Sequence, residues 1–491
     1  MSDETHQTVN DAAALEPVDF NEMTIDDLAR VLDLTIRYDD ENKCILFLGF
    51  LTAYTEADQL NLYINGPSSS GKTYLVTEVA KYFPEEDVEE YASASPTSFI
   101  HRYPTKDPET GRYYIDCERK ILLFLELPHH QLQAKLRPFL SHDKKEIVYL
   151  TTDKNKRGGN RAKESRLRGY AATAFCSVSM RMDDQEATRA ILLSPEVSEA
   201  KLTEGIELSM LRTADPAKYQ EMIDNDPLRQ QLKRRVRAIK ELHINSVIIP
   251  DPETVLTIFK QITKKPKPRH QRDIAHLGSL IKAVALINAW WRLDDQRNVV
   301  ANEADVEQAI LLWKRISTSQ ELGIPPFAYN FYKTFIVPAF EEKNGGRQPE
   351  LVEANGATGV TRADIRAKHF QLTGQMVNED DLRRNILPTL EAASLIIQEK
   401  DPANGKQIVI FPKYSRNEYS GDDTVAENEG GNKLVNRQLQ APKVNSESSG
   451  TVNYVIPENI REVFGDDVEM LGEPPPNFGD EKPGNEGGLN G

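Results

Sequence analysis

The sequence predicts an α/β fold, in which parallel strands alternate with helices, and three observations lead to that prediction. A short apolar strand over residues 61–65 leads into a glycine-rich loop and then into an expected helix over residues 73–83. Residues 120–126 form an apolar run, typical of a buried parallel strand, that ends in a carboxylate. Residues 170–178 form another apolar strand that ends in serines. Strands and helices that alternate in this way build a parallel sheet.

The loop at residues 66–73 is a complete G-x-x-x-x-G-K-T pattern. Its glycines let backbone N–H groups turn toward a phosphate, its lysine reaches the β- and γ-phosphates, and its threonine hydroxyl binds Mg²⁺. The following helix directs its positive end at the same anion. The sequence therefore predicts an NTPase with ATP and Mg²⁺ as cofactors. The expected nucleotide-binding residues are Gly66, Pro67, Ser68, Ser69, Ser70, Gly71, Lys72 and Thr73, and Thr73 is also an expected metal ligand.

Length and composition indicate a protein of the cytoplasm. A chain of 491 residues suggests about two to four domains. The apolar run at residues 121–125 is too short to span a bilayer, so no membrane association is expected. Cys44, Cys117 and Cys176 lie far apart, which excludes a zinc cluster built from cysteine pairs and does not suggest a disulfide framework.

The net charge of -16 is concentrated in the two tails. Residues 417–491 contain 15 acidic and 5 basic side chains, and residues 1–20 contain 5 acidic side chains and no lysine or arginine. Residues 21–416 are therefore close to neutral and can carry local basic surfaces. Both tails are expected to be disordered. The apolar stretch 454–464 could be a short binding helix or merely a residual apolar patch.

The carboxylate at the end of the strand 120–126 is Glu126. In phosphate-loop NTPases, acids that follow such a strand hold Mg²⁺ and position the attacking water. Leu125 stands where the first acid of the usual Asp-Glu pair would be. Glu126 could therefore act on water, on Mg²⁺ or on both, and an ordinary strand-end glutamate is the alternative.

Residues 146–168 alternate around Gly158-Gly159, which predicts a β-hairpin. Its tip and return arm carry seven basic residues, which favours contact with a phosphate backbone over a merely solvated loop. These residues are Lys154, Lys156, Arg157, Arg161, Lys163, Arg166 and Arg168.

Polar and basic residues follow the strand 170–178. Ser179, or alternatively Ser177, is a candidate to contact the γ-phosphate. An arginine shortly after such a strand can reach the ATP of a neighbouring subunit and stabilise the transition state. Arg189 is the first candidate for that catalytic role and Arg181 the second, while a structural salt bridge remains the alternative.

The remaining body reads as two smaller units. Helices are expected at residues 271–288 and 300–313, the second with a capping signal at Asn302 and Asp305. Residues 321–416 predict a winged helix, with helix starts at residues 361 and 378 and a hairpin over 395–411 that turns at Asn404-Gly405.

Two features of this predicted winged helix bear on its function. Pro388 should kink or shorten the third helix. That helix offers Arg383 and Arg384 to the major groove of DNA, although a role in contacting proteins is the alternative.

The order of phosphate loop, acid-ending strand, basic hairpin, polar-ending strand and Thr188-Arg189 resembles that of AAA+ ATPases. A hairpin just before the polar-ending strand resembles the clade of MCM and viral superfamily-3 helicases, over residues 40–320. The resemblance implies an AAA+ core at 21–215, a helical lid at 216–320 and a winged helix at 321–416. It also implies a homo-hexamer, a hairpin that grips nucleic acid in a central channel, and a nucleotide-binding role for Arg272, with Arg269 as the fallback.

These features together predict an ATP-driven, ring-forming motor on single-stranded or forked DNA, a replicative-type helicase of a plasmid, virus or integrated element. Its acidic tails could contact replication or mobile-element proteins. One alternative is an AAA+ switch, such as a loader or transposition regulator, that hydrolyses ATP without unwinding. Another is a nucleotide-gated regulator that uses its winged helix on a promoter.

Overall fold

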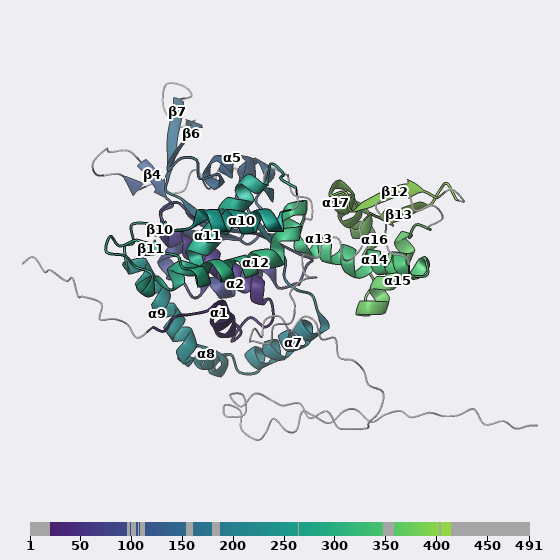
Figure 1. Cartoon of the computed structure of the whole chain (residues 1–491), viewed down its shortest axis with the longest axis horizontal. Helices are drawn as coiled ribbons and strands as arrows, with labels where there is room; N and C mark the ends of the chain where they lie inside the picture. The colour runs from purple at the N-terminus through teal and green to yellow at the C-terminus, as the bar shows by residue number, and fades with distance from the viewer. Residues whose placement is uncertain are drawn as a thin grey trace, which may run out of the picture. The chain divides into compact units, whose positions relative to one another are not determined.

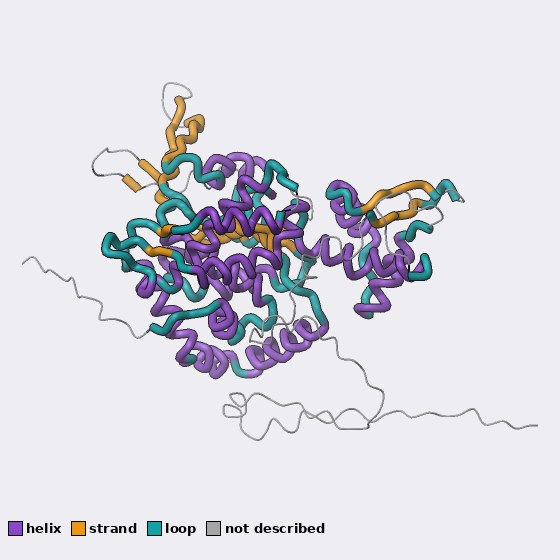
Figure 2. The backbone as a smooth tube through the Cα atoms, viewed as in Figure 1, coloured by secondary structure: helices purple, strands orange, loops and turns teal. Residues whose placement is uncertain are grey.

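A five-stranded parallel sheet forms the centre of the computed structural model (Figure 1 and Figure 2). The structure describes residues 20–95, 105–106, 113–153, 161–178, 187–263, 265–346, 358–401 and 404–413, with Phe99 and Pro108. The strands lie in the order β2 (Val88–Tyr91), β5 (Lys120–Phe124), β8 (Ala171–Ser177), β1 (Asn61–Asn65) and β9 (Ile191–Leu193). Every neighbouring pair is parallel, so the predicted α/β fold with a parallel sheet is confirmed.

Both faces of this sheet are covered by helices, because successive side chains of a strand point to opposite faces. Leu62 and Ile64 of β1 share a core with α2 (Asp40–Leu51), α3 (Lys72–Ala80) and the helices α11 (His270–Ile287) and α12 (Glu303–Leu322). Tyr63 of β1 faces the other way and shares a second core with α5 (His130–Leu140). The result is a three-layered arrangement of helix, sheet and helix.

The strand order creates a switch point between β1 and β8. From β1 the chain continues to β2 at the far side of β8, and from β8 it continues to β9 at the far side of β1. Neighbouring strands whose connections run in opposite directions leave a crevice at their carboxyl ends, where open α/β sheets bind ligands. The loop at residues 66–71 follows β1 directly, so it lies at the carboxyl ends of these strands.

Residues 199–322 are mainly helical. The helices are α7 (Glu199–Ala214), α8 (Pro216–Asn225), α9 (Pro227–Glu241), α10 (Pro252–Ile262), α11 and α12, with a short pair of strands β10 (Val247–Ile248) and β11 (Val299–Val300). Asp-Pro pairs start α8, α9 and α10, where the aspartate accepts a backbone N–H and the proline takes the first helical position. The predicted capping signal is confirmed at α12, where Asn302 and Asp305 form a capping box.

The predicted β-hairpin is confirmed. Strands β6 (Glu146–Asp153) and β7 (Arg161–Arg168) pair antiparallel and extend away from the central sheet (Figure 1). With β3 (Thr105–Lys106) and β4 (Tyr113–Asp116) they form a second sheet in the order β3-β4-β7-β6. Only Gly169 and Tyr170 separate β7 from β8.

Residues 324–413 have a hydrophobic core of their own. Their helices, in chain order, are α13 (Pro326–Phe331), α14 (Val337–Lys343), α15 (Arg362–Thr373), α16 (Glu379–Asp381) and α17 (Leu387–Ala392). The hairpin of β12 (Ile396–Lys400) and β13 (Ile408–Pro412) follows, and Val360 bridges to Ile410. The expected helix starts after Thr361 and Asn378 and the expected hairpin are confirmed, whereas the winged-helix interpretation stays a prediction.

The sequence predicts that Pro388 kinks or shortens its helix; the helix continues through Pro388 to Ala392 and is not shortened. A π-helical turn over residues 382–386 leads into α17, in which the N–H of Leu387 bonds to the carbonyl of Leu382 and Pro388 follows. The wider turn accommodates a ring that lacks an N–H and would otherwise clash with the preceding turn. Pro338 of α14 follows a second π-helical turn, over residues 332–336, in the same way.

Candidate functional site

The loop after β1 encloses the side chain of Lys72. The ammonium nitrogen of Lys72 donates to the carbonyl oxygens of Gly66 at 2.9 Å and Pro67 at 2.6 Å. Burial lowers the pKa of Lys72. Gly71, which precedes α3, has a φ of +88°, a conformation that favours glycine. The local sequence therefore holds a charged nitrogen inside the loop at the N-terminus of a helix.

The residues of this loop fit a phosphate group. A Cβ atom on Gly66 would lie 2.9 Å from the hydroxyl oxygen of Ser70, so a larger residue there would crowd the loop. That hydroxyl is buried and has no hydrogen-bond partner in the described part of the chain. Buried polar groups normally have a partner. A bound phosphate would supply one, and Thr73, which is exposed in the first turn of α3, could reach Mg²⁺.

Polar side chains lie at or just beyond the carboxyl ends of three neighbouring strands. The pairing of β1 with β8 aligns Asn65 with Ser177. The pairing of β5 with β8 ends at Phe124 and Phe175, and Glu126 follows two residues after the end of β5, in a bend. Asn65, Ser177 and Glu126 therefore belong to the same edge of the sheet. Ser177, rather than Ser179, is the serine at the strand end, and Ser179 and Arg181 lie outside the described residues.

The residue before Ser177 is a cysteine that the sequence reasoning did not use. Burial raises the pKa of the Cys176 thiol to about 12, although Lys72 and a hydrogen bond with Thr73 act in the opposite direction. A neutral thiol therefore lies beside the two residues predicted to hold the phosphates and the metal. Its place near the end of a predicted buried strand was the signal that could have located it, and the end of β1 could have located Asn65 in the same way.

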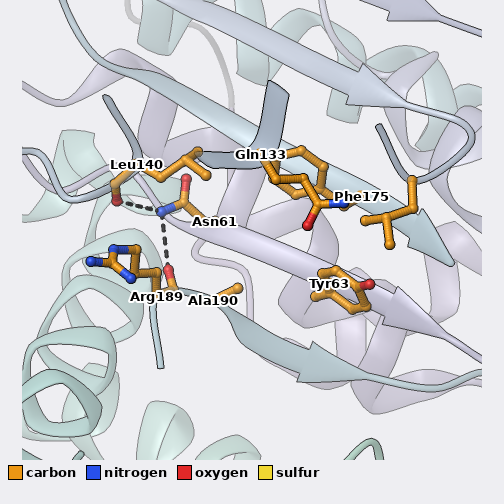
Figure 3. Close-up of a pocket in the computed structure, with 8 residues that line it drawn as sticks. Asn61, Tyr63, Gln133, Leu140, Phe175, Arg189 and Ala190 are labelled. Carbon is orange, nitrogen blue, oxygen red and sulfur yellow. Dashed lines mark hydrogen bonds between the residues drawn. The ribbon is translucent and has the colours of Figure 1, made fainter. Parts of the chain in front are cut away.

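Arg189 lies at the opposite edge of the sheet. Its Nε donates to the hydroxyl of Ser141 at 2.9 Å, and its carbonyl oxygen accepts from the amide of Asn61 at 3.0 Å (Figure 3). Asn61 begins β1, whereas the phosphate-binding pattern follows its end. Five residues of strand separate the two, which is about 16 Å at the usual rise.

Arg272 is near Arg189 and not near Lys72. Arg272 is the third residue of α11, and its guanidinium donates to the hydroxyl of Thr188 at 2.5 Å. The structure therefore places the two predicted nucleotide-contacting arginines at one edge, away from the loop of their own chain. The fallback candidate, Arg269, is engaged by Asp273, with its Nε 3.0 Å from a carboxylate oxygen.

Two histidines near this arginine edge are neutral. Burial lowers the pKa of His142 to about 4 and that of His276 to about 3. His142 follows Ser141, the partner of Arg189, and the two histidines are close enough to influence each other electrostatically. At neutral pH the positive charge of this edge therefore comes from its arginines and lysines.

The base of the hairpin uses two of the seven predicted basic residues internally. Arg166 forms ion pairs with Glu146 and Glu164, and Arg168 lies over the ring of Tyr114 at 5.3 Å. Arg161 and Lys163 lie at the far end of β7, opposite Asp153 and Thr151. Their side chains, and all of Lys154, Lys156 and Arg157, lie outside the described residues.

Arg383 and Arg384 lie together on the π-helical turn before α17. Arg383 pairs with a carboxylate oxygen of Asp380 at 2.9 Å, and Arg384 lies 3.5 Å from the same oxygen. Their side chains are 50% and 68% exposed, so both can still reach a partner. One carboxylate offsets part of their charge.

Comparison with known proteins adds no assignment: no protein-family model and no curated protein matches the chain. Within the described ranges, no helix combines the length and apolar character that crossing a bilayer requires. The same ranges contain no group of three or more histidine, cysteine, aspartate or glutamate residues arranged to hold a metal ion. Thr73 and Glu126 remain the residues that the sequence predicts as Mg²⁺ contacts.

Proposed function

We propose that this chain is an ATP-dependent, ring-forming AAA+ motor that acts on DNA, of the replicative-helicase type. The observation that carries the proposal is the pairing of Asn65 with Ser177, with Glu126 just beyond the end of β5, at the edge of the sheet where the loop encloses Lys72. Phosphate-loop NTPases need this combination of a phosphate cradle and a carboxylate at the ends of neighbouring strands.

Each residue at the carboxyl edge has a distinct role in this proposal. Lys72 and the loop N–H groups bind the phosphates, and Thr73 contacts Mg²⁺, which supplies charge neutralisation when bound. Glu126 is exposed beyond the end of β5 and orients water or accepts its proton. Ser177 donates toward the γ-phosphate from the end of β8.

The position of the arginines supports assembly. Arg189 and Arg272 lie at the amino edge of the sheet, about 16 Å along β1 from the loop of the same chain. Side chains of this kind can act on a nucleotide only when a second copy presents them. Head-to-tail contacts of this type close into rings, and the resemblance to MCM-type helicases favours six subunits.

The hairpin supports an action on single-stranded or forked DNA. It leaves the body as two paired strands of eight residues each, and its far end carries Arg161 and Lys163. Ion pairs of Arg166 brace its base. A projecting basic hairpin suits a phosphate backbone, whose recognition is electrostatic and independent of sequence.

A switch that hydrolyses ATP without unwinding is the second candidate. It is favoured by Leu125, which is half-buried and leaves Glu126 as a single carboxylate at the end of β5. A site with one acid suits slow turnover that times an assembly. Such a protein would bind DNA through its hairpin or through Arg383 and Arg384 but would not translocate.

The test is ATP hydrolysis with and without single-stranded DNA. The variants are the wild type, a hairpin variant with Lys156→Ala, Arg157→Ala and Arg161→Ala, and a control with Arg234→Ala, Arg237→Ala and Lys314→Ala. The control removes the same charge from exposed positions of α9 and α12. Stimulation of about 10-fold that only the hairpin variant loses is expected of a motor. Turnover that ignores single strands would favour the switch, and no turnover at all would refute both.

A further inference from the structure

Helix α7 is an unusual element of this fold because it buries none of its 16 residues. Leu202, Ile206 and Met210 lie four residues apart and form one apolar stripe, 46%, 70% and 64% exposed respectively. Helices in proteins owe most of their stability to packing of an apolar face. A stripe that lies open on a helix of this length therefore indicates a docking surface.

The other face of α7 is held against the phosphate-loop side of the molecule. Lys201 pairs with the buried Asp39, and Arg212 lies 5.6 Å from the ring of Tyr74 in the first turn of α3. Pro195, which precedes α7, packs against Gly66. These contacts fix the stripe outward at the edge where the nucleotide is proposed to bind.

A complementary face lies on α10 and at the start of α11. Leu256 and Lys260 are exposed one turn apart on α10, and Lys265 and Arg272 are exposed just beyond. The rings of Phe259 and His270, 6.1 Å apart, join the end of α10 to the start of α11. This face is therefore continuous with the arginine edge.

The charges beside the two faces are largely opposite. At helical spacing, Glu199 lies on the stripe of α7 and Glu207 flanks it, and both are exposed. The α10 face presents Lys260 and Lys265, with Glu253 as an acid at its start. We propose that α7 is the surface on which a second copy of this chain docks, with its α10 face against Leu202, Ile206 and Met210. The proposal rests on the proposed function, because the arginine edge of one copy must meet the phosphate-loop edge of the next.

The first test compares the assembly state of the Ile206→Glu variant with that of the wild type. Sedimentation velocity measures it in the presence of Mg²⁺ and a slowly hydrolysed ATP analogue. The variant should lose the assembled species and sediment as a monomer, because burying a carboxylate in an apolar contact is costly. Its affinity for a fluorescent ATP analogue should stay within about threefold of the wild type, which shows that it is folded. The matched control is Phe370→Glu, on a side chain that is 53% exposed in α15 and outside the proposed contact.

A charge exchange tests the partner face. Glu207→Lys and Lys260→Glu should each weaken assembly, and the double variant should recover at least part of it. Failure of the double variant to recover would overturn the pairing of α7 with α10.

The outcomes separate this proposal from the proposed function. Ile206→Glu that assembles like the wild type would overturn the docking role of α7 alone. A wild-type protein that binds and hydrolyses ATP but stays monomeric would overturn the proposal, and the partner of α7 would then be a different protein. A wild-type protein that binds no nucleotide would refute the proposed function.

Discussion

The two edges of the central sheet carry different chemistry although they belong to the same strands. At the carboxyl edge, Asn65 is paired with Ser177, Glu126 follows the end of β5, and a loop encloses Lys72. At the amino edge, Arg189 and Arg272 contact hydroxyl groups of Ser141 and Thr188. The first edge carries the residues proposed to bind a nucleotide, and the second carries the two arginines proposed to act on a neighbouring copy. The difference fits the proposal that one copy of the chain holds two halves of two different sites.

Lys72→Ala should have the largest effect on this comparison. It removes the only cation that the described loop encloses, so ATP hydrolysis should fall by about 1,000-fold or more. Steady-state turnover measures the loss, and circular dichroism checks that the fold remains. The control is Lys81→Ala, near the end of the same helix, where the lysine pairs with Glu78. Wild-type turnover in Lys72→Ala would refute the NTPase proposal.

Arg189→Ala should reduce turnover by about 100- to 1,000-fold while nucleotide affinity hardly changes, because the arginine is remote from its own loop. Mixing it with Lys72→Ala sharpens the comparison between the edges. An interface in which the Arg189→Ala copy supplies the loop and the Lys72→Ala copy supplies the arginine has both parts intact, so some turnover should reappear. Mixtures as inactive as their components would show that the two edges do not meet.

Glu126→Gln should lower kcat by about 100-fold, because the amide cannot accept a proton from water. ATP binding should persist, since the phosphate loop is unchanged. A fluorescent nucleotide separates binding from turnover. Glu118→Gln, in the turn before β5, is the control at the other end of the same strand. Equal turnover in Glu126→Gln and the wild type would show that Glu126 is an ordinary strand-end glutamate without a catalytic role.

The smallest expected effect concerns stability at low pH. Burial holds the pKa of His142 at about 4, below its value in the unfolded chain of about 6.5. The unfolded state therefore binds more protons as the pH falls, and the free energy of unfolding should drop by about 2 kcal/mol between pH 6.5 and 4.

Urea titrations of the wild type and of His142→Asn measure this slope. Asparagine tolerates the φ of +55° at this position, so the substitution should flatten the curve without straining the backbone. His130→Asn, at an exposed position, should leave it unchanged. A curve for His142→Asn that matches the wild type would assign the pH dependence to other groups.

The sequence was sufficient for elements whose pattern is local. The strand before the phosphate loop, the hairpin of β6 and β7 and the start of α15 were predicted because alternation, glycines and capping residues lie within a few positions of one another. Glu126 could be recognised at a strand end for the same reason. The edge strand β2 (Val88–Tyr91) was missed, because two of its four residues are glutamates and it is only partly buried.

The sequence was insufficient where strand order decides the outcome. Ser177 ends a strand that lies between β1, which ends in Asn65, and β5, which Glu126 follows, and no local pattern contains this strand order. The meeting of Arg272 with Thr188 joins residues 84 positions apart. The exposed stripe of α7 was also invisible, because leucine, isoleucine and methionine at helical spacing ordinarily indicate a buried face.

The short junction between β7 and β8 has a mechanical consequence. Gly169 has a φ of +81°, and a Cβ atom there would lie 2.7 Å from the backbone nitrogen of Glu118, so only glycine allows the chain to turn so tightly. Beyond it, β8 runs for seven residues, about 23 Å, to Ser177. A strand that is hydrogen-bonded on both sides is stiff along its length. The hairpin and Ser177 thus lie at opposite ends of β8. A displacement of the hairpin along the axis of this strand should therefore move Ser177 as well.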